Sequence, residues 1–135
     1  MKTVLVLDGQ GGGVGRALVE KLVAAQLDCR IVGVGTNAMA TNAMLKAGAL
    51  GATGENAAIV NARKADIIVG PMGIVLANSM MGEVSPAMAA AVGGADAARV
   101  LIPITQCSTY VAGISDKTLS SFIEDAVEKI KQLLQ

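Results

Sequence analysis

The sequence predicts an α/β domain with a doubly wound, mainly parallel sheet and helices on both faces. Three observations lead to this class. Short, continuous apolar runs recur along the chain, and such runs are typical of strands buried on both faces of a parallel sheet. They alternate with stretches of helical periodicity, which implies parallel strands joined by right-handed crossovers. The length of 135 residues fits one domain, 1–135, with a core of its own.

The first half of the chain is predicted to alternate strand and helix twice. The order is a strand at 4–7, a helix at 14–26, a strand at 30–34 and a helix at 38–47. The last of these helices stops at Gly48, a residue type that suits a helix C-cap. We expect residues 48–54 to be loop. Residues 57–62 fit a strand or a helix, and we favour a short helix.

The second half continues the alternation. We expect a strand at 66–69, a short extended piece at 74–76, a helix at 86–92, a strand at 99–104, an edge strand at 109–114 and an amphipathic helix at 119–134. Ser85 and Pro86 are typical of an N-cap followed by the first helical position. On the last helix, Asp125 and Lys129 are spaced for an i,i+4 ion pair.

Composition excludes several classes of partner. The net charge is zero, without a basic or acidic block, so the chain has no electrostatic footprint for nucleic acid or an anionic membrane. Tyr110 and Phe122 are the only aromatic residues, too few for a base-stacking surface. No apolar stretch approaches the length of a spanning helix, and no signal peptide is recognisable. We therefore predict a cytoplasmic protein.

Metal and disulfide chemistry are also not expected. The sequence contains no His, which removes the commonest metal ligand and the commonest general base. Cys29 and Cys107 are too few for a disulfide framework, and we predict that both are small buried residues. No carboxylate cluster completes a two-Cys zinc site.

A glycine cluster, DGQGGGVG, stands between the first strand and the first helix. This Rossmann-like arrangement suits a phosphate, because glycines let backbone amides approach an anion and the helix N-terminus adds donors and a positive dipole end. The G-x-G-x-x-G register does not fit, whereas Gly9, Gly13 and Gly15 have the spacing of the short-chain dehydrogenase/reductase family, which this first third of the chain resembles. The alternative is a turn that packs helix on sheet without a ligand.

The family pattern of these dehydrogenases then ends. No Tyr-x-x-x-Lys pair follows, since Ile114 stands four residues after Tyr110. The acid expected after the second strand, which would bind a ribose 2′-hydroxyl, is replaced by Thr36 and Asn37. The sequence therefore predicts no more than about a tenfold preference for NAD over NADP, unless another carboxylate such as Glu55 reads the ribose.

A second resemblance spans almost the whole chain. The motifs DGQGGGVG, GTNAMAT, AMLKAGA, GATGENA, KADIIVGPMGI, NSMMGE and LIPI resemble an uncharacterised family of short bacterial proteins, domain-of-unknown-function family 3842. The resemblance implies a family and no reaction.

In doubly wound sheets ligands lie beyond the carboxyl ends of the strands, at the switch point. The cofactor-binding residues predicted there are Asp8, Gly9, Gln10, Gly11, Gly12, Gly13, Val14, Gly15, Gly35, Thr36, Asn37, Gly70, Pro71, Met72 and Gly73. The segment Thr105, Gln106 and Cys107 should also meet them. The first cofactor candidate is NAD or NADP, and the partner is a small phosphate-containing ligand.

Several polar residues have open roles. Asp8 is unusual beside an anion site; it either hydrogen-bonds the loop's own amides, holds a cation or contacts a hydroxyl. Arg16 either offsets that charge or is simply solvated. In GATGEN, Thr53, Glu55 and Asn56 are either turn and N-cap residues or part of a loop that folds over the ligand. In ANSMMGE, Asn78, Ser79 and Glu83 follow a stretch that begins at the expected switch point, and they are either site residues or solvated loop.

Three functions stay open at this stage. The first is a small protein that binds a nucleotide or dinucleotide, the second a non-catalytic sensor or assembly subunit, and the third an enzyme acting on a small phosphorylated metabolite. Catalysis is undecided, and the acid–base or nucleophilic groups available are Asp8, Glu55, Lys64, Glu83, Cys107 and Tyr110. The Ala- and Met-rich segments 37–50 and 78–92 predict exposed apolar helix faces, and hence a homo-oligomer, most simply a two-fold dimer.

Overall fold

Five parallel strands form the centre of the molecule. The computed structural model describes residues 1–104 and 108–135. In sheet order the strands are β3 (Leu50–Thr53), β2 (Cys29–Gly35), β1 (Lys2–Asp8), β4 (Ile67–Pro71) and β5 (Ala98–Ile102). The chain builds outward from β1 to β3 and then crosses back to the other side of β1. The predicted doubly wound fold is confirmed, and its switch point lies between β1 and β4.

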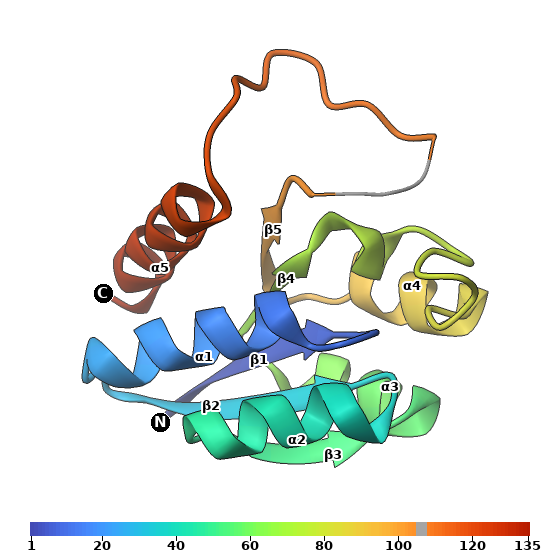
Figure 1. Cartoon of the computed structure of the whole chain (residues 1–135). Helices are drawn as coiled ribbons and strands as arrows, with labels where there is room; N and C mark the ends of the chain where they lie inside the picture. The colour runs from blue at the N-terminus through green and yellow to red at the C-terminus, as the bar shows by residue number, and fades with distance from the viewer. Residues whose placement is uncertain (105–107) are drawn as a thin grey trace.

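Helices cover both faces of this sheet (Figure 1). They are α1 (Gly13–Ala24), α2 (Ala38–Ala47), α3 (Glu55–Lys64), α4 (Pro86–Gly93) and α5 (Leu119–Leu134), with a short 3-10 helix, η1 (Met72–Val75). Side chains of α1, α2 and α5 belong to one buried apolar cluster, and those of α3 and α4 to a second. The chain thus has a core on each side of the sheet. No helix among the described residues is both long and apolar enough to cross a membrane.

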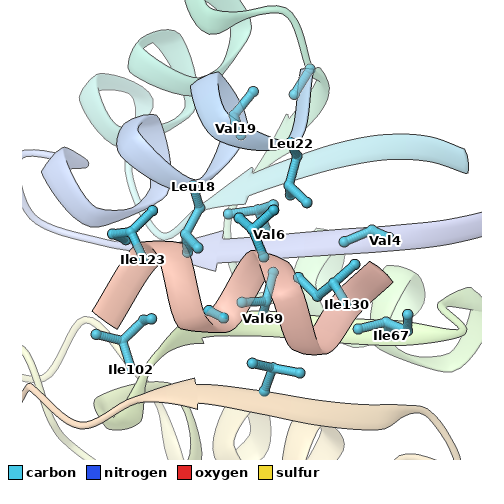
Figure 2. Close-up of a cluster of buried hydrophobic side chains, with 14 of the residues drawn as sticks. Val4, Val6, Leu18, Val19, Leu22, Ile67, Val69, Ile102, Ile123 and Ile130 are labelled. Carbon is cyan, nitrogen blue, oxygen red and sulfur yellow. The ribbon is translucent and has the colours of Figure 1, made fainter. Parts of the chain in front are cut away.

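Strand β1 shows how the two cores arise from one apolar run. Successive side chains of a strand point to opposite faces. Val4 and Val6 therefore pack under α1 and α5, where Figure 2 shows them among the aliphatic side chains of those helices. Leu5 and Leu7 enter the second cluster, under α3 and α4. All four side chains are fully buried, which is why the run is apolar without alternation.

The predicted signals at helix ends are present in the structure. Gly48, which follows α2, has a left-handed φ of 117°, as a C-cap glycine does. The Ser85 hydroxyl accepts a hydrogen bond from the amide of Met88 and caps α4. On α5, the Lys129 Nζ lies 2.6 Å from the Asp125 Oδ2. These elements begin and end where local side-chain chemistry requires.

The expectation that residues 48–54 are loop is wrong, because Leu50–Thr53 form the edge strand β3. It pairs with β2 in parallel register, Gly51 opposite Gly33. A Cβ at Gly51 would lie 2.8 Å from the Leu45 Cδ2 of α2 and 2.9 Å from the Gly33 carbonyl oxygen of β2. The Leu45 side chain can move aside, but the backbone of β2 cannot do so easily, so the position favours glycine over the bulky residues that usually indicate a strand.

Two further expectations need correction. Residues 74–76 are not an extended piece: Ile74 lies in η1, whose turn places its side chain fully inside the second cluster. Residues 109–114 form no strand; Gly113 has a left-handed φ of 80° and Tyr110 is 93% exposed. Strand β5 ends at Ile102, earlier than expected, because Pro103 has no amide to donate to a ladder. In Figure 1 the described residues 108–118 run away from the sheet before α5 begins.

Candidate functional site

The glycine loop is organised around the carboxylate of Asp8, the last residue of β1. Asp8 is 4% exposed. Its Oδ1 accepts a hydrogen bond from the Gly9 amide at 2.8 Å, and its Oδ2 accepts one from the Gly15 amide at 2.6 Å. Of the three roles considered for Asp8, the structure shows the first, since the carboxylate ties the loop's own amides to the start of α1.

Burial of Asp8 disfavours the ionised form of its carboxyl group. Burial raises the pKa of its carboxyl above the usual 3.8, and the nearby charge of Glu83 acts in the same direction. The amides of Gly15 and Gly9 oppose this by stabilising the ionised form, but they do not outweigh burial. Asp8 is therefore a structural carboxylate that brings negative charge close to the loop.

Three of the loop glycines are required by packing inside the protein. A Cβ at Gly9 would lie 2.6 Å from the Thr36 Oγ1, and one at Gly15 would lie 2.9 Å from the Asp8 Cβ. Gly12 has a left-handed φ of 75°, and a Cβ there would lie 2.8 Å from the Ala40 Cα. Any side chain at these positions would displace backbone or closely packed groups, so these glycines need no ligand to explain them.

Gly11 and Gly13 have no such reason to be glycine. A Cβ at either position would meet no atom within 4 Å, and neither has a left-handed backbone. Their amides donate no hydrogen bond to any described residue. Both residues lie where β1 passes into α1, so they leave the N-terminus of that helix open to solvent.

A second carboxylate, that of Glu83, closes the site beside the loop. Its Oε1 accepts three hydrogen bonds: from the Thr36 hydroxyl at 2.6 Å, from the Asn37 side-chain amide at 2.8 Å and from the Gln10 backbone amide at 2.9 Å. The Thr36 hydroxyl contributes most to lowering the pKa of Glu83 below its usual range. Glu83 therefore joins the loops after β1, β2 and η1 while carrying its charge.

Asn37 connects the same loops a second time. Its side-chain oxygen accepts from the Ala40 amide and caps α2, and its amide group donates to the Gln10 carbonyl as well as to Glu83. The neighbouring Gly35 is close-packed, because a Cβ there would lie 2.5 Å from the Thr41 amide nitrogen. Thr36 and Asn37 thus hold the position after β2 with hydrogen-bonding groups and no charge of their own.

The predicted segment Gly70, Pro71, Met72 and Gly73 lies across the switch point, at the end of β4 and in η1. The loop 76–85 covers it: the buried Ser79 hydroxyl donates to the Gly73 carbonyl, and the Met80 Sδ lies where it would contact a Cβ at Gly9. This loop has left-handed backbone at three non-glycine residues, Asn78, Met80 and Met81. It is a folded cover over the end of the sheet, so the reading of ANSMMGE as solvated loop is not what its contacts show.

A hollow of about 550 Å³ adjoins the glycine loop on its outer side, between α1 and α2. Gly11 lines it, together with Arg16, Glu20 and Lys46. Arg16 is 65% exposed and pairs with Glu20, with the Arg16 Nε 2.8 Å from the Glu20 Oε1. Two cations and one carboxylate therefore border the space next to Gly11.

The other predicted groups lie at different places. Glu55 begins α3 directly after β3, whose last residue, Thr53, pairs with Gly35 at the end of β2. Lys64 ends α3 at the other end of the strands, and Tyr110 lies in the exposed segment after β5. Thr53 uses its hydroxyl to bond that of Thr41 at 2.7 Å. The expected contribution of Thr105, Gln106 and Cys107 lies outside the described residues.

Cys29 is only partly buried, at the start of β2. Among the residues that the structure describes, no group of three or more Cys, Asp or Glu side chains could hold a metal ion. Sequence reasoning missed the contact of Glu83 with Thr36 and Asn37, which are more than 45 positions away. The one available signal was the order of the strands, which brings the ends of β1, β2 and β4 to the same edge of the sheet.

Comparison with protein families agrees with the second resemblance seen in the sequence. The model of the family described as Domain of unknown function (DUF3842) matches residues 3–135, so the chain belongs to this family. None of the curated proteins matches the sequence. The resemblance of the glycine loop to short-chain dehydrogenases/reductases stays a prediction.

Three of the solved structures that match this chain illustrate the similarity. BdcA (YjgI) from E. coli is 31% identical over 50% of the chain, with a TM-score of 0.35, and the chain spans 39% of its length. A dodecameric FMN-dependent Ubix-like decarboxylase from Escherichia coli O157:H7 is 13% identical over 96% of the chain and 76% of its own length, with a TM-score of 0.43. AtPrR2 in apo form is 17% identical over 97% of the chain and 45% of its own length, with a TM-score of 0.45.

Proposed function

We propose that this protein binds a nucleotide or dinucleotide, with NAD or NADP the first candidates, at the carboxyl ends of β1 and β2. The observation that carries the proposal is the contrast within the glycine loop. Gly9, Gly12 and Gly15 are explained by packing, whereas Gly11 and Gly13 are exposed at the N-terminus of α1 and their amides donate to none of the described residues. Bare amides at a helix N-terminus are suited to a phosphate.

The surroundings support an anionic group on this side of the loop. Arg16, Lys46 and Glu20 line the hollow that begins at Gly11, and because Glu20 pairs with Arg16, Lys46 is the cation left for a phosphate in this space. The hollow's volume of about 550 Å³ is within the ordinary range for small-molecule sites. The buried carboxylate of Asp8 lies on the other side of the loop and would repel a phosphate placed there.

The proposal concerns binding and no reaction. Among the described residues, Asp8 and Glu83 beside the loop are engaged in internal hydrogen bonds, and Glu20, which borders the hollow, pairs with Arg16. The lowered pKa of Glu83 makes it a weak base near neutral pH. Sensing or assembly without catalysis remains compatible with this site, and so does catalysis with groups that the ligand itself supplies.

The test is a glycine exchange that fills the open space without disturbing the fold. Gly13→Val adds a branched side chain at the start of α1, at a position where a Cβ would meet no neighbouring group within 4 Å. We expect calorimetric titration with NAD, NADP and ATP to show at least a tenfold loss of affinity for whichever binds, with an unchanged far-ultraviolet circular dichroism spectrum. Gly93→Val is the matched control, since a Cβ at Gly93 also meets no atom but lies at the end of α4.

Equal affinity of the Gly13→Val variant and the unmodified protein would mean that the loop is a packing turn. A thermal-shift panel with the same nucleotides and with sugar phosphates separates the remaining alternatives. A ligand present at 100 times its Kd stabilises the folded protein by about 2.7 kcal/mol. If sugar phosphates stabilise the protein and nucleotides do not, the function as an enzyme acting on a small phosphorylated metabolite is favoured over nucleotide binding.

A further inference from the structure

We infer that Glu83 reads the sugar of the bound nucleotide, accepting a hydrogen bond from a ribose hydroxyl and rejecting a phosphate at that position. The inference rests on the proposed function, because it names the selectivity of the same site. It replaces the expectation, drawn from the neutral residues Thr36 and Asn37, that the position after β2 lacks a carboxylate.

The two oxygens of Glu83 have different surroundings. Oε1 is saturated by donors from three segments: the Thr36 hydroxyl, the Asn37 side-chain amide and the Gln10 backbone amide. Oε2 accepts no hydrogen bond from any described residue, and the side chain is partly exposed. A carboxylate fixed through one oxygen holds the other in a defined place, ready to accept a hydrogen bond from a ligand hydroxyl.

The position of Glu83 matches the place where a sugar would lie. Gly35 ends β2 directly opposite Asp8 at the end of β1, and the Thr36 amide donates to the Asp8 carbonyl. Gln10, the neighbour of Gly11, donates its backbone amide to Glu83, so a phosphate placed at Gly11 would have its next group near this junction. In dinucleotide-binding folds an acid at the end of the second strand binds the ribose hydroxyl. Here the acid comes from the loop after η1, 46 residues beyond Asn37.

The charge of Glu83 is not neutralised by its partners. All three donors to Oε1 are neutral, and no Lys or Arg of the described residues forms an ion pair with it. The buried Asp8 adds a second negative charge on the same side of the loop. A phosphate on the sugar would meet this negative potential, whereas a hydroxyl would find an acceptor. The unphosphorylated ribose is therefore the group that fits.

The experiment compares ligands on the unmodified protein, so that it does not depend on a variant folding. Isothermal titration is carried out with NAD, 2′-deoxy-NAD and NADP, and with ATP and 2′-deoxy-ATP in case the ligand is a mononucleotide. We expect NAD to bind at least tenfold tighter than NADP, and each ribose form to bind at least threefold tighter than its 2′-deoxy analogue. Equal affinities for NAD and NADP, tighter binding of NADP, or equal affinities for a ribose form and its 2′-deoxy analogue would overturn the inference and leave the proposed function standing.

Glu83→Gln then assigns the selectivity to this side chain. Its amide oxygen retains the acceptor for Thr36, Asn37 and Gln10, while the negative charge is removed. We expect the NAD to NADP affinity ratio to fall below about threefold, and Glu128→Gln, a charge removal on α5, to leave the ratio unchanged. An unchanged ratio in Glu83→Gln would limit Glu83 to holding the loops together. If none of the five ligands binds, the proposed function is refuted, and the inference with it.

Discussion

Adding one methyl group to the glycine loop should have opposite effects at Gly13 and Gly15, which lie two positions apart at the start of α1. In Gly15→Ala the new Cβ would lie 2.8 Å from the Met44 Sδ and 2.9 Å from the Asp8 Cβ. The flexible Met44 can move aside, but Asp8 is held by the hydrogen bond between its Oδ2 and the Gly15 amide. In Gly13→Ala the new Cβ meets nothing within 4 Å.

The magnitudes follow from these distances. Overpacking of a close contact costs about 1–3 kcal/mol, and Gly15→Ala also forces the Asp8 carboxylate away from its amide partner. The gain in helix propensity, about 0.5–1 kcal/mol, offsets only part of this. Gly13→Ala has the gain without the clash, so its free energy of unfolding should rise by about 0.4–1 kcal/mol. The two variants should differ by about 2 kcal/mol.

Urea unfolding followed by far-ultraviolet circular dichroism measures this difference. Fluorescence is unsuitable, because the chain has no Trp and its one Tyr is 93% exposed. The slope of the unfolding free energy against urea concentration should be the same in both variants, so that a shift in midpoint reports stability alone. If Gly15→Ala proves as stable as Gly13→Ala, the close packing of α1 on Asp8 is not what makes Gly15 necessary.

The remaining predictions concern charge, loop strain and association. Burial raises the pKa of Asp8 in the folded protein, so the free energy of unfolding that this carboxyl contributes falls as the pH rises from 3.8 through the pKa of the folded state. Hydrogen bonds lower the pKa of Glu83, so the free energy of unfolding that this carboxylate contributes is lost as the pH falls below 4.5. Urea unfolding of Asp8→Asn and Glu83→Gln from pH 3 to 7 gives, for each variant, the difference in free energy of unfolding from the unmodified protein. These two differences should change with pH in opposite directions, and a change in the same direction would contradict the reasoning. Met81 is 95% exposed with a left-handed φ of 56°, so Met81→Asn should gain up to about 1 kcal/mol of stability in the same assay. In sedimentation at micromolar concentration we expect a two-fold dimer that Met39→Glu weakens, since Met39 is 68% exposed on α2; a single species of 13.6 kDa would contradict it.

Most of the fold could be predicted because its strands are bulky apolar runs and its helices end at recognisable caps. β1 illustrates the first case, with four fully buried aliphatic side chains in succession, and Ser85 the second. β3 could not be predicted in the same way. Its Gly51 closely approaches the Gly33 carbonyl oxygen of β2 and Leu45 of α2, and these contacts exist only once strand and helix have packed together.

The candidate site could likewise be predicted from the sequence only in part. The strand–glycine–helix order predicted where the loop would lie, because the ends of parallel strands meet at one edge of the sheet. The carboxylate that closes the site could not be predicted, because Glu83 reaches Thr36 only through the folding of the loop 76–85. That loop depends on left-handed backbone at Asn78, Met80 and Met81, and Met carries no local preference for such a conformation.

The distribution of charge around the loop gives a direction to any ligand bound there. Asp8 and Glu83 make the side over the strand ends negative, and the Asp8 carboxylate already occupies the Gly9 and Gly15 amides. Arg16 and Lys46 lie in the hollow that begins at Gly11, together with Glu20. We therefore expect an anionic group toward the space between α1 and α2, and a hydroxyl-bearing group toward β2. A nucleotide whose phosphate adjoins a ribose with free hydroxyls carries both groups next to each other, and it is the ligand that we propose for this loop.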